Sequence, residues 1–276
     1  MQDSQSLRED AYVMGRSAAE YERLAVQARA WDDATRLAIS QTGLRSGMSA
    51  LDVGCGTGAA MRLMAEVVGS RGRVTGIDTD ARIGNMALDR LRAEGPDVYA
   101  FVEADVSRDP GINGGPFDLV FARLFFFHMS EPVRTLNWLW QWVKPGGALL
   151  VMDYDMTVVK SSPPNELFSR AMKIMLDTFI ATGKDIEIGW RIPVLFRQSD
   201  VGIPDWCGAY GIVEHKSSAG GMLRLVLTSL RKAAIERGVA KASTLDEIDS
   251  KLSKIPAGAF FGRWPDMVAT LKRKTS

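Results

Sequence analysis

Residues 49–58 constrain the fold of this chain more than any other stretch. Their sequence, SALDVGCGTG, places a short apolar run directly before three spaced glycines, Gly54, Gly56 and Gly58. A helical pattern follows at once, and its apolar face carries Ala60, Leu63, Met64 and Val67. Strand, glycine turn and helix in this order predict the opening unit of a nucleotide-binding βαβ fold, in which glycines let a ligand lie against bare main chain.

The glycines alone do not name the ligand. The stretch also fits the dinucleotide pattern G-x-G-x-x-G/A, and a tight turn that binds nothing is a further alternative. Asp52, two residues before Gly54, separates these interpretations. A carboxylate at the strand end repels a pyrophosphate, whereas it suits a ligand that carries an ammonium group and a sulfonium. S-adenosylmethionine has both groups and no phosphate, so it is the ligand that we expect.

Residues 51–58, LDVGCGTG, resemble the first motif of class I S-adenosylmethionine-dependent methyltransferases. The resemblance is to bacterial enzymes of the small-molecule type, similar to the methyltransferases of ubiquinone and menaquinone biosynthesis. It implies an α/β fold: a doubly wound, seven-stranded, mostly parallel sheet of the Rossmann-like kind. It also implies an N-terminal helical cap, whereas the change of pattern after Asp155 predicts an insertion after the fifth strand. The lysine-proline-glycine-glycine run at 144–147, before that strand, matches the family as well.

Asp78 ends the predicted second strand, 20 residues beyond Gly58 (78 − 58). An acid at this position and spacing accepts hydrogen bonds from ribose hydroxyls. The alternative is that Asp78 caps the helix predicted from Ala81 onward. Because Thr79 or Asp80 can also provide that cap, we favour ribose binding for Asp78.

The resemblance implies further contacts with the cofactor. By this resemblance, Asp105 accepts a hydrogen bond from the adenine amino group, and the N–H of Val106 donates to the adenine ring. The main chain at Arg123 receives the ammonium of the methionine moiety. Tyr12 and Gln27, in the N-terminal segment, are further expected contacts. The complete expected set is Asp52, Gly54, Cys55, Gly56, Gly58, Asp78, Thr79, Asp105, Val106, Arg123, Tyr12 and Gln27.

Two side chains are predicted as catalytic bases. His128 follows the fourth strand at the cofactor site and has an ordinary pKa close to working pH. Asp153 ends the fifth strand. The alternative for His128 is a structural histidine, and many methyltransferases of this fold use no base. Aromatic residues near the crevice, Phe125–Phe127, Trp190 and Phe196, predict a small and largely apolar methyl acceptor.

The chain divides into four predicted regions. Residues 1–42 form a helical lid, 43–155 the cofactor-binding core, 156–211 a helical insertion for the substrate pocket, and 212–276 strands and helices that complete the sheet. We expect the sixth strand at 212–216 and the last one within 260–271, where Pro265 keeps part of the segment out of strand pairing.

Composition narrows the function classes. The 276 residues include 34 Lys and Arg against 33 Asp and Glu, which gives no electrostatic footprint for nucleic acid. The two cysteines make no disulfide framework, there is no signal peptide and no apolar run spans a membrane, so a cytoplasmic location is expected. We expect no metal, and a homodimer is left open. The alternative functions are another reaction on bound S-adenosylmethionine and, less favoured because of Asp52, an NAD-dependent oxidoreductase.

Overall fold

The computed structural model describes residues 27–214, 218–256 and 258–276. These residues form two compact units, each considered by itself. The larger unit contains residues 27–153, Gly189–Ala209 and Met267–Ser276, and the smaller one contains Tyr154–Ile188 and Tyr210–Asp266. Tyr12 and most of the predicted lid lie outside the described residues.

A seven-stranded sheet organises the larger unit, with the strand order β3-β2-β1-β4-β5-β10-β7. The pairs β1–β2, β1–β4, β2–β3 and β4–β5 are parallel. The strands are β1 (Ser49–Val53), β2 (Arg73–Asp78), β3 (Tyr99–Glu103), β4 (Phe117–Arg123), β5 (Val143–Asp155), β7 (Trp206–Tyr210) and β10 (Asp266–Arg273). The predicted seven-stranded, mostly parallel sheet is therefore confirmed.

Strand β10 enters this sheet in the opposite direction to β5. The N–H of Gly146, near the start of β5, donates to the carbonyl of Lys274 at 2.9 Å, and the N–H of Lys274 donates to the Gly147 carbonyl at 2.8 Å. The end of β10 therefore lies beside the start of β5. Four successive residues of β1 and four of β4 are buried, as expected for central strands that are covered on both faces.

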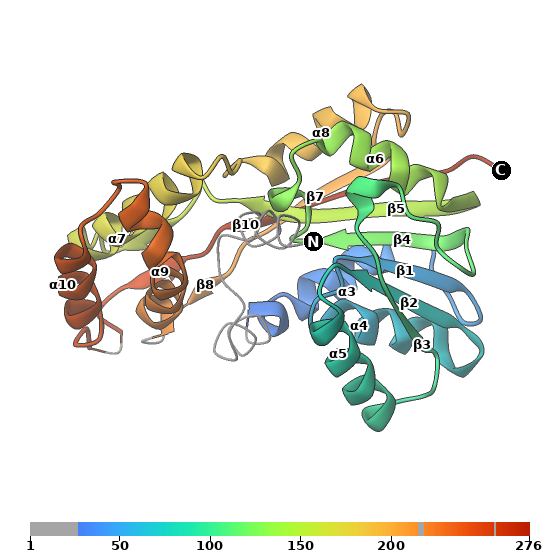
Figure 1. The fold of residues 1–276 in the computed structure, drawn as a ribbon, viewed down its shortest axis with the longest axis horizontal. Helices are drawn as coiled ribbons and strands as arrows, with labels where there is room; N and C mark the ends of the chain where they lie inside the picture. Colours follow the sequence, from blue (N-terminus) through green and yellow to red (C-terminus); the bar gives the residue numbers. More distant parts are fainter. Residues whose placement is uncertain (1–26, 215–217, 257) are drawn as a thin grey trace, which may run out of the picture. The chain divides into compact units, whose positions relative to one another are not determined.

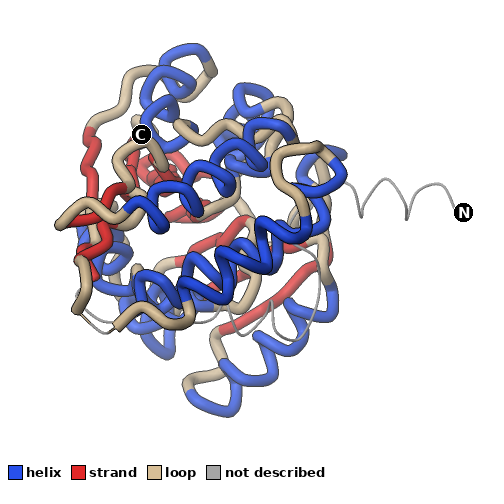
Figure 2. The backbone as a smooth tube through the Cα atoms, turned by 90° about the vertical axis from the view of Figure 1, so that its left-hand side faces the viewer, coloured by secondary structure: helices blue, strands red, loops and turns tan. Residues whose placement is uncertain are grey.

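Helices cover the sheet of the larger unit. They are α3 (Asp32–Ser40), α4 (Ala59–Val68), α5 (Ala81–Glu94), α6 (Pro132–Gln141) and α8 (Ile188–Gln198). Figure 1 shows α3, α4 and α5 gathered near β1–β3, whereas α6 and α8 lie near β5. Figure 2 draws the same helices in blue and the strands in red. The buried face of α4 includes Ala60, Leu63 and Met64, as predicted. Val67, which was also predicted on this face, is exposed, and Val68 is buried in its place.

The smaller unit is built from three helices and a small antiparallel sheet. The helices are α7 (Glu166–Ala181), α9 (Ser218–Glu236) and α10 (Ala242–Leu252), and the strands are β6 (Lys160–Ser162), β8 (Val213–Glu214) and β9 (Phe261–Arg263). The rings of Phe168 and Phe260 pack with their centroids 5.1 Å apart. The Arg224 guanidinium pairs with Asp249 at 2.7 Å and ties α9 to α10.

The C-terminal part of the chain differs from the sequence prediction in one respect. The predicted strand at 212–216 is wrong for the large sheet, which takes Trp206–Tyr210 instead, while Val213–Glu214 pairs with β9 in the small sheet. Only β10, of the strands described after residue 211, joins the large sheet. Pro265 lies between β9 and β10 and outside both, as expected from its missing N–H.

Candidate functional site

The glycine loop between β1 and α4 has a backbone that needs glycine. Gly54, Gly56 and Gly58 have φ angles of 70°, 48° and 75°, in the left-handed region. A Cβ atom added to Gly54 would lie 2.6 Å from a ring carbon of Phe125, and one added to Gly58 would lie 2.8 Å from Leu91. The loop is therefore both strained for other residues and closely approached by side chains.

Asp52 lies at the base of this loop and is almost fully buried, with 2% of its surface exposed. Its Oδ2 atom is buried and receives no hydrogen bond from the part of the chain that the structure describes. Burial raises the pKa of this carboxyl to about 7, and the nearby Asp78 raises it further, while the positive charge of Arg123 acts in the opposite direction. A buried carboxylate oxygen without a donor is costly, and it indicates that a cationic or N–H-bearing ligand completes the site.

Asp78, at the end of β2, braces the glycine loop. Its Oδ2 accepts from the N–H of Gly56 at 2.9 Å, and its Oδ1 accepts from the N–H of Asp80 at 3.0 Å. Burial raises the pKa of Asp78. Asp80 caps α5 by accepting from the N–H groups of Arg82 and Ile83, so the cap does not fall to Asp78. Since each carboxylate oxygen accepts two hydrogen bonds, Asp78 keeps acceptor capacity for ribose hydroxyls.

Asp105 ends the turn after β3 and is engaged locally. Its Oδ1 accepts from the N–H and the hydroxyl of Ser107, at 3.0 and 2.6 Å, and Arg108 approaches Oδ2 at 3.3 Å. Val106 follows it and is buried. Of the other expected contacts, Cys55 is buried, Gln27 is half-buried and Thr79 is exposed.

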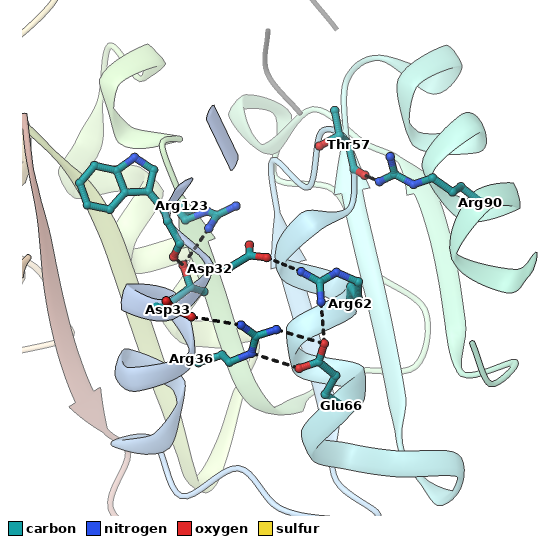
Figure 3. Close-up of polar contacts among 10 residues, drawn as sticks. Asp32, Asp33, Arg36, Thr57, Arg62, Glu66, Arg90 and Arg123 are labelled. Atoms are coloured by element: carbon teal, nitrogen blue, oxygen red, sulfur yellow. Dashed lines mark hydrogen bonds and ion pairs between the residues drawn. The ribbon is translucent and has the colours of Figure 1, made fainter. Parts of the chain in front are cut away.

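Arg123 ends β4, and its side chain turns toward α3. Nη1 of Arg123 donates to Oγ1 of Thr35 at 2.7 Å, and the same hydroxyl donates to the carbonyl of Trp31 at 2.7 Å (Figure 3). Leu124 follows with φ 55°, a left-handed conformation for a branched residue, and so directs the chain into the next turn.

His128 and Asp153 are connected through the main chain. Asp153 is fully buried, and its Oδ2 accepts from the N–H of Phe127 at 3.0 Å. Phe127 and His128 belong to a 3₁₀ turn, Phe126–His128, and their rings meet edge to face at 5.4 Å. Asp153 therefore fixes the turn that carries His128, which gives it a supporting role that the sequence did not predict.

Sequence reasoning missed two further residues that hold the site together. Thr35 supports Arg123 from 88 positions away, and Arg90 in α5 donates to the carbonyl of Thr57 in the glycine loop at 2.7 Å (Figure 3). Neither residue belongs to a local motif. Within the described part of the chain, no cluster of three or more His, Cys, Asp or Glu could hold a metal ion, and none of the described helices could cross a membrane.

Residues 50–147 match the family described as the methyltransferase domain. The strand order of the larger unit is that of the class I, Rossmann-like methyltransferase fold, and residues 50–147 are the part of the chain that is similar to this family. Among solved structures, phosphoethanolamine N-methyltransferase 2 of Haemonchus contortus, in complex with phosphomonomethylethanolamine and S-adenosylhomocysteine, has a TM-score of 0.52 at 17% identity. The alignment covers 88% of this chain and 53% of that one, and at this identity it shows the fold alone.

Two curated relatives extend the comparison. The chain is 32% identical over 137 residues to the ubiquinone/menaquinone biosynthesis C-methyltransferase UbiE of Pseudomonas savastanoi pv. phaseolicola, covering 49% of this chain and 51% of that enzyme. It thus spans about half the length of this relative. It is 25% identical over 213 residues to the 2-phytyl-1,4-naphthoquinone methyltransferase of Nostoc punctiforme, covering 74% of this chain and 88% of that enzyme.

Proposed function

We propose that this protein is an S-adenosylmethionine-dependent methyltransferase that acts on a small, largely apolar molecule. The observation that carries the proposal is the buried Oδ2 of Asp52, which has no donor among the described residues and lies at the base of a glycine loop. The ammonium of the methionine moiety supplies that donor. A dinucleotide would instead bring a pyrophosphate toward the buried Asp52 and the half-buried Asp78, and an NAD-dependent reaction is therefore disfavoured.

The residues fit the cofactor in order along the sheet. Asp52 receives the ammonium, Asp78 the ribose hydroxyls, and Asp105 with Val106 the adenine, while the glycine loop brings bare main chain against the ligand. The cofactor supplies a methyl group that is already activated by its positive sulfur. The protein then has to align the acceptor with that methyl group and exclude water.

An apolar acceptor is supported by the residues near the end of β4. Phe125 and Phe127 are half-buried there, whereas Phe126 and Phe196 are fully buried and belong to the core, so the latter two do not line a pocket. Trp190 is 66% exposed on α8. The names of the two curated relatives, a quinone-biosynthesis and a naphthoquinone methyltransferase, favour an acceptor of ring-containing, apolar character.

Location and assembly belong to the same proposal. Cys55 and Cys207 are free cysteines, which is typical of a reducing compartment, and we infer a cytoplasmic protein. A homodimer stays a prediction that sedimentation of the purified protein would test.

Mass spectrometry of the purified protein tests the proposed function. We expect S-adenosylmethionine or S-adenosylhomocysteine to copurify, and methyl groups to pass to a member of a panel of quinols, phenols and amines. Copurified cofactor with no transfer to any acceptor, but with turnover of another kind, would favour the alternative in which the fold uses S-adenosylmethionine for a different reaction. A bound nicotinamide dinucleotide would contradict the proposal.

Cofactor binding is expected to weaken as the pH falls below 7. The pKa of Asp52 is raised to about 7, so the carboxylate that pairs with the ammonium is lost on acidification. The charged groups that act on it are Arg123, which lowers its pKa, and Asp78, which raises it and has a raised pKa of its own. One pH unit below the pKa leaves about a tenth of the carboxyl ionised, so affinity should fall about tenfold.

Calorimetric titration with S-adenosylhomocysteine between about pH 5.5 and 8.5 measures this dependence. Asp52→Asn is the matched variant, because it keeps the shape of the side chain and cannot ionise. It should bind weakly at every pH and with a flatter profile. An affinity of the unmodified protein that does not change across this range would show that Asp52 does not pair with the ammonium.

A further inference from the structure

Arg123 places a fixed positive charge at the same sheet edge as Asp52. In the parallel pair β1–β4, Asp52 lies opposite Phe121 and Val53 opposite Ala122, so Arg123 follows directly where both strands end. This placement agrees with the direction in which the positive charge of Arg123 acts on the buried Asp52 carboxyl, which is to lower its pKa. The site therefore presents an acid and a guanidinium from neighbouring strands.

The guanidinium of Arg123 is held by helix α3, which is itself fixed to α4. Thr35 is fully buried, and its hydroxyl accepts from Nη1 of Arg123 while it donates to the Trp31 carbonyl. Helix α3 is in turn pinned to α4, because Arg36 pairs with Glu66 at 3.2 Å and Arg62 bridges Asp32 and Glu66 (Figure 3). Since α4 begins at the glycine loop, the position of Arg123 is coupled to the frame of the cofactor site.

The charges of the cofactor indicate which of its groups the Arg123 guanidinium can bind. The methionine end of S-adenosylmethionine carries an ammonium and a sulfonium, both of which a guanidinium repels. Its one negative group is the α-carboxylate, on the same carbon atom as the ammonium. A guanidinium beside the acid that receives the ammonium is therefore favourable only if it contacts this carboxylate. The planar arrangement of its N–H donors matches the two oxygens of a carboxylate.

We propose that the side chain of Arg123 binds the α-carboxylate of the cofactor, with Thr35 as the positioning residue, so that Asp52 and Arg123 together recognise the amino-acid zwitterion. This inference rests on the proposed function. It goes beyond the sequence prediction for Arg123, which concerned only its main chain. The proposed pair makes the site selective for cofactor forms that retain the carboxylate.

Calorimetry with two ligands tests the proposal. S-adenosylhomocysteine and its decarboxylated form, S-adenosyl-3-thiopropylamine, differ only in the α-carboxylate, and both carry the ammonium. The unmodified protein should bind the first ligand about tenfold or more tightly than the second, as expected for a charged hydrogen-bonded pair. In Arg123→Met this ratio should collapse toward one, chiefly through loss of affinity for S-adenosylhomocysteine.

The variants separate recognition from indirect effects. If Arg123 acted only by keeping Asp52 ionised, Arg123→Met would weaken both ligands equally and leave the ratio unchanged, which would overturn the proposal. Thr35→Val should lower the ratio in part, because the guanidinium loses its support. Arg134→Met, which removes an exposed arginine of α6 that pairs with Asp109, should keep the ratio of the unmodified protein. Binding of neither ligand by the unmodified protein would instead contradict the proposed function.

Discussion

Replacing His128 by alanine is expected to lower kcat for methyl transfer by about 10²–10⁴-fold while leaving the affinity for S-adenosylhomocysteine unchanged, the range typical of a lost general base. The expectation applies to an acceptor whose nucleophilic atom carries a proton at neutral pH. His128 lies in the turn after β4, at the edge of the sheet where the cofactor site is proposed, and histidine is the side chain that most often serves as a general base. Rates measured across pH should lose their acidic limb in the variant.

Asp153 variants show which group takes the proton. Asp153→Asn keeps an oxygen that can accept from the Phe127 N–H, so the turn that carries His128 should hold and kcat should stay near normal. If Asp153 were the base, this variant would be as inactive as His128→Ala. A His128→Ala protein with nearly normal kcat and an unchanged pH profile would show that His128 is structural and that proximity alone carries the reaction.

Replacing Asp78 by alanine is expected to weaken cofactor binding by about 10- to 100-fold. Hydrogen bonds to a charged group contribute about 1.5–3 kcal/mol, and the variant loses those that the ribose hydroxyls make with the carboxylate. It also leaves the Gly56 N–H without its partner, so the glycine loop loses a brace. Calorimetric titration with S-adenosylhomocysteine measures the loss directly.

Asp80→Ala is the matched control for Asp78→Ala. Asp80 is a carboxylate two residues further on, and it caps α5 through the N–H groups of Arg82 and Ile83. Its loss should lower the free energy of unfolding by about 1 kcal/mol, which is typical for a helix cap, and leave the cofactor affinity unchanged. Equal loss of affinity in both variants would mean that the effect comes from disturbing the start of α5 and not from a lost ribose contact.

The first half of the fold could be predicted from the sequence because its signals are local. Apolar runs that end in Asp52, Asp78 and Arg123 mark the central parallel strands, and left-handed glycines mark the loop between β1 and α4. The edge strand Trp206–Tyr210 gave a weak signal. It contains a glycine and is only half-buried on alternate residues, whereas the β-branched pair at 212–213 is the stronger strand pattern and joins the small sheet instead.

Only those residues of the candidate site that lie at the ends of strands could be predicted from the sequence. Asp52, Asp78 and Arg123 meet at one sheet edge because parallel strands bring their carboxyl ends together. The contacts that support them depend on tertiary packing. The hydrogen bond between Arg123 and Thr35, and the one between Asp153 and Phe127, join segments far apart in the chain, and no local pattern announces either partner.

The central claim is that this site binds S-adenosylmethionine through Asp52 and Asp78, and a paired calorimetric titration with S-adenosylmethionine and NAD tests it most directly. The account predicts saturable binding of S-adenosylmethionine at one site per chain, weaker binding in both Asp52→Asn and Asp78→Ala, and no measurable binding of NAD. Tighter binding of NAD than of S-adenosylmethionine, or an affinity for S-adenosylmethionine that neither substitution changes, would contradict it.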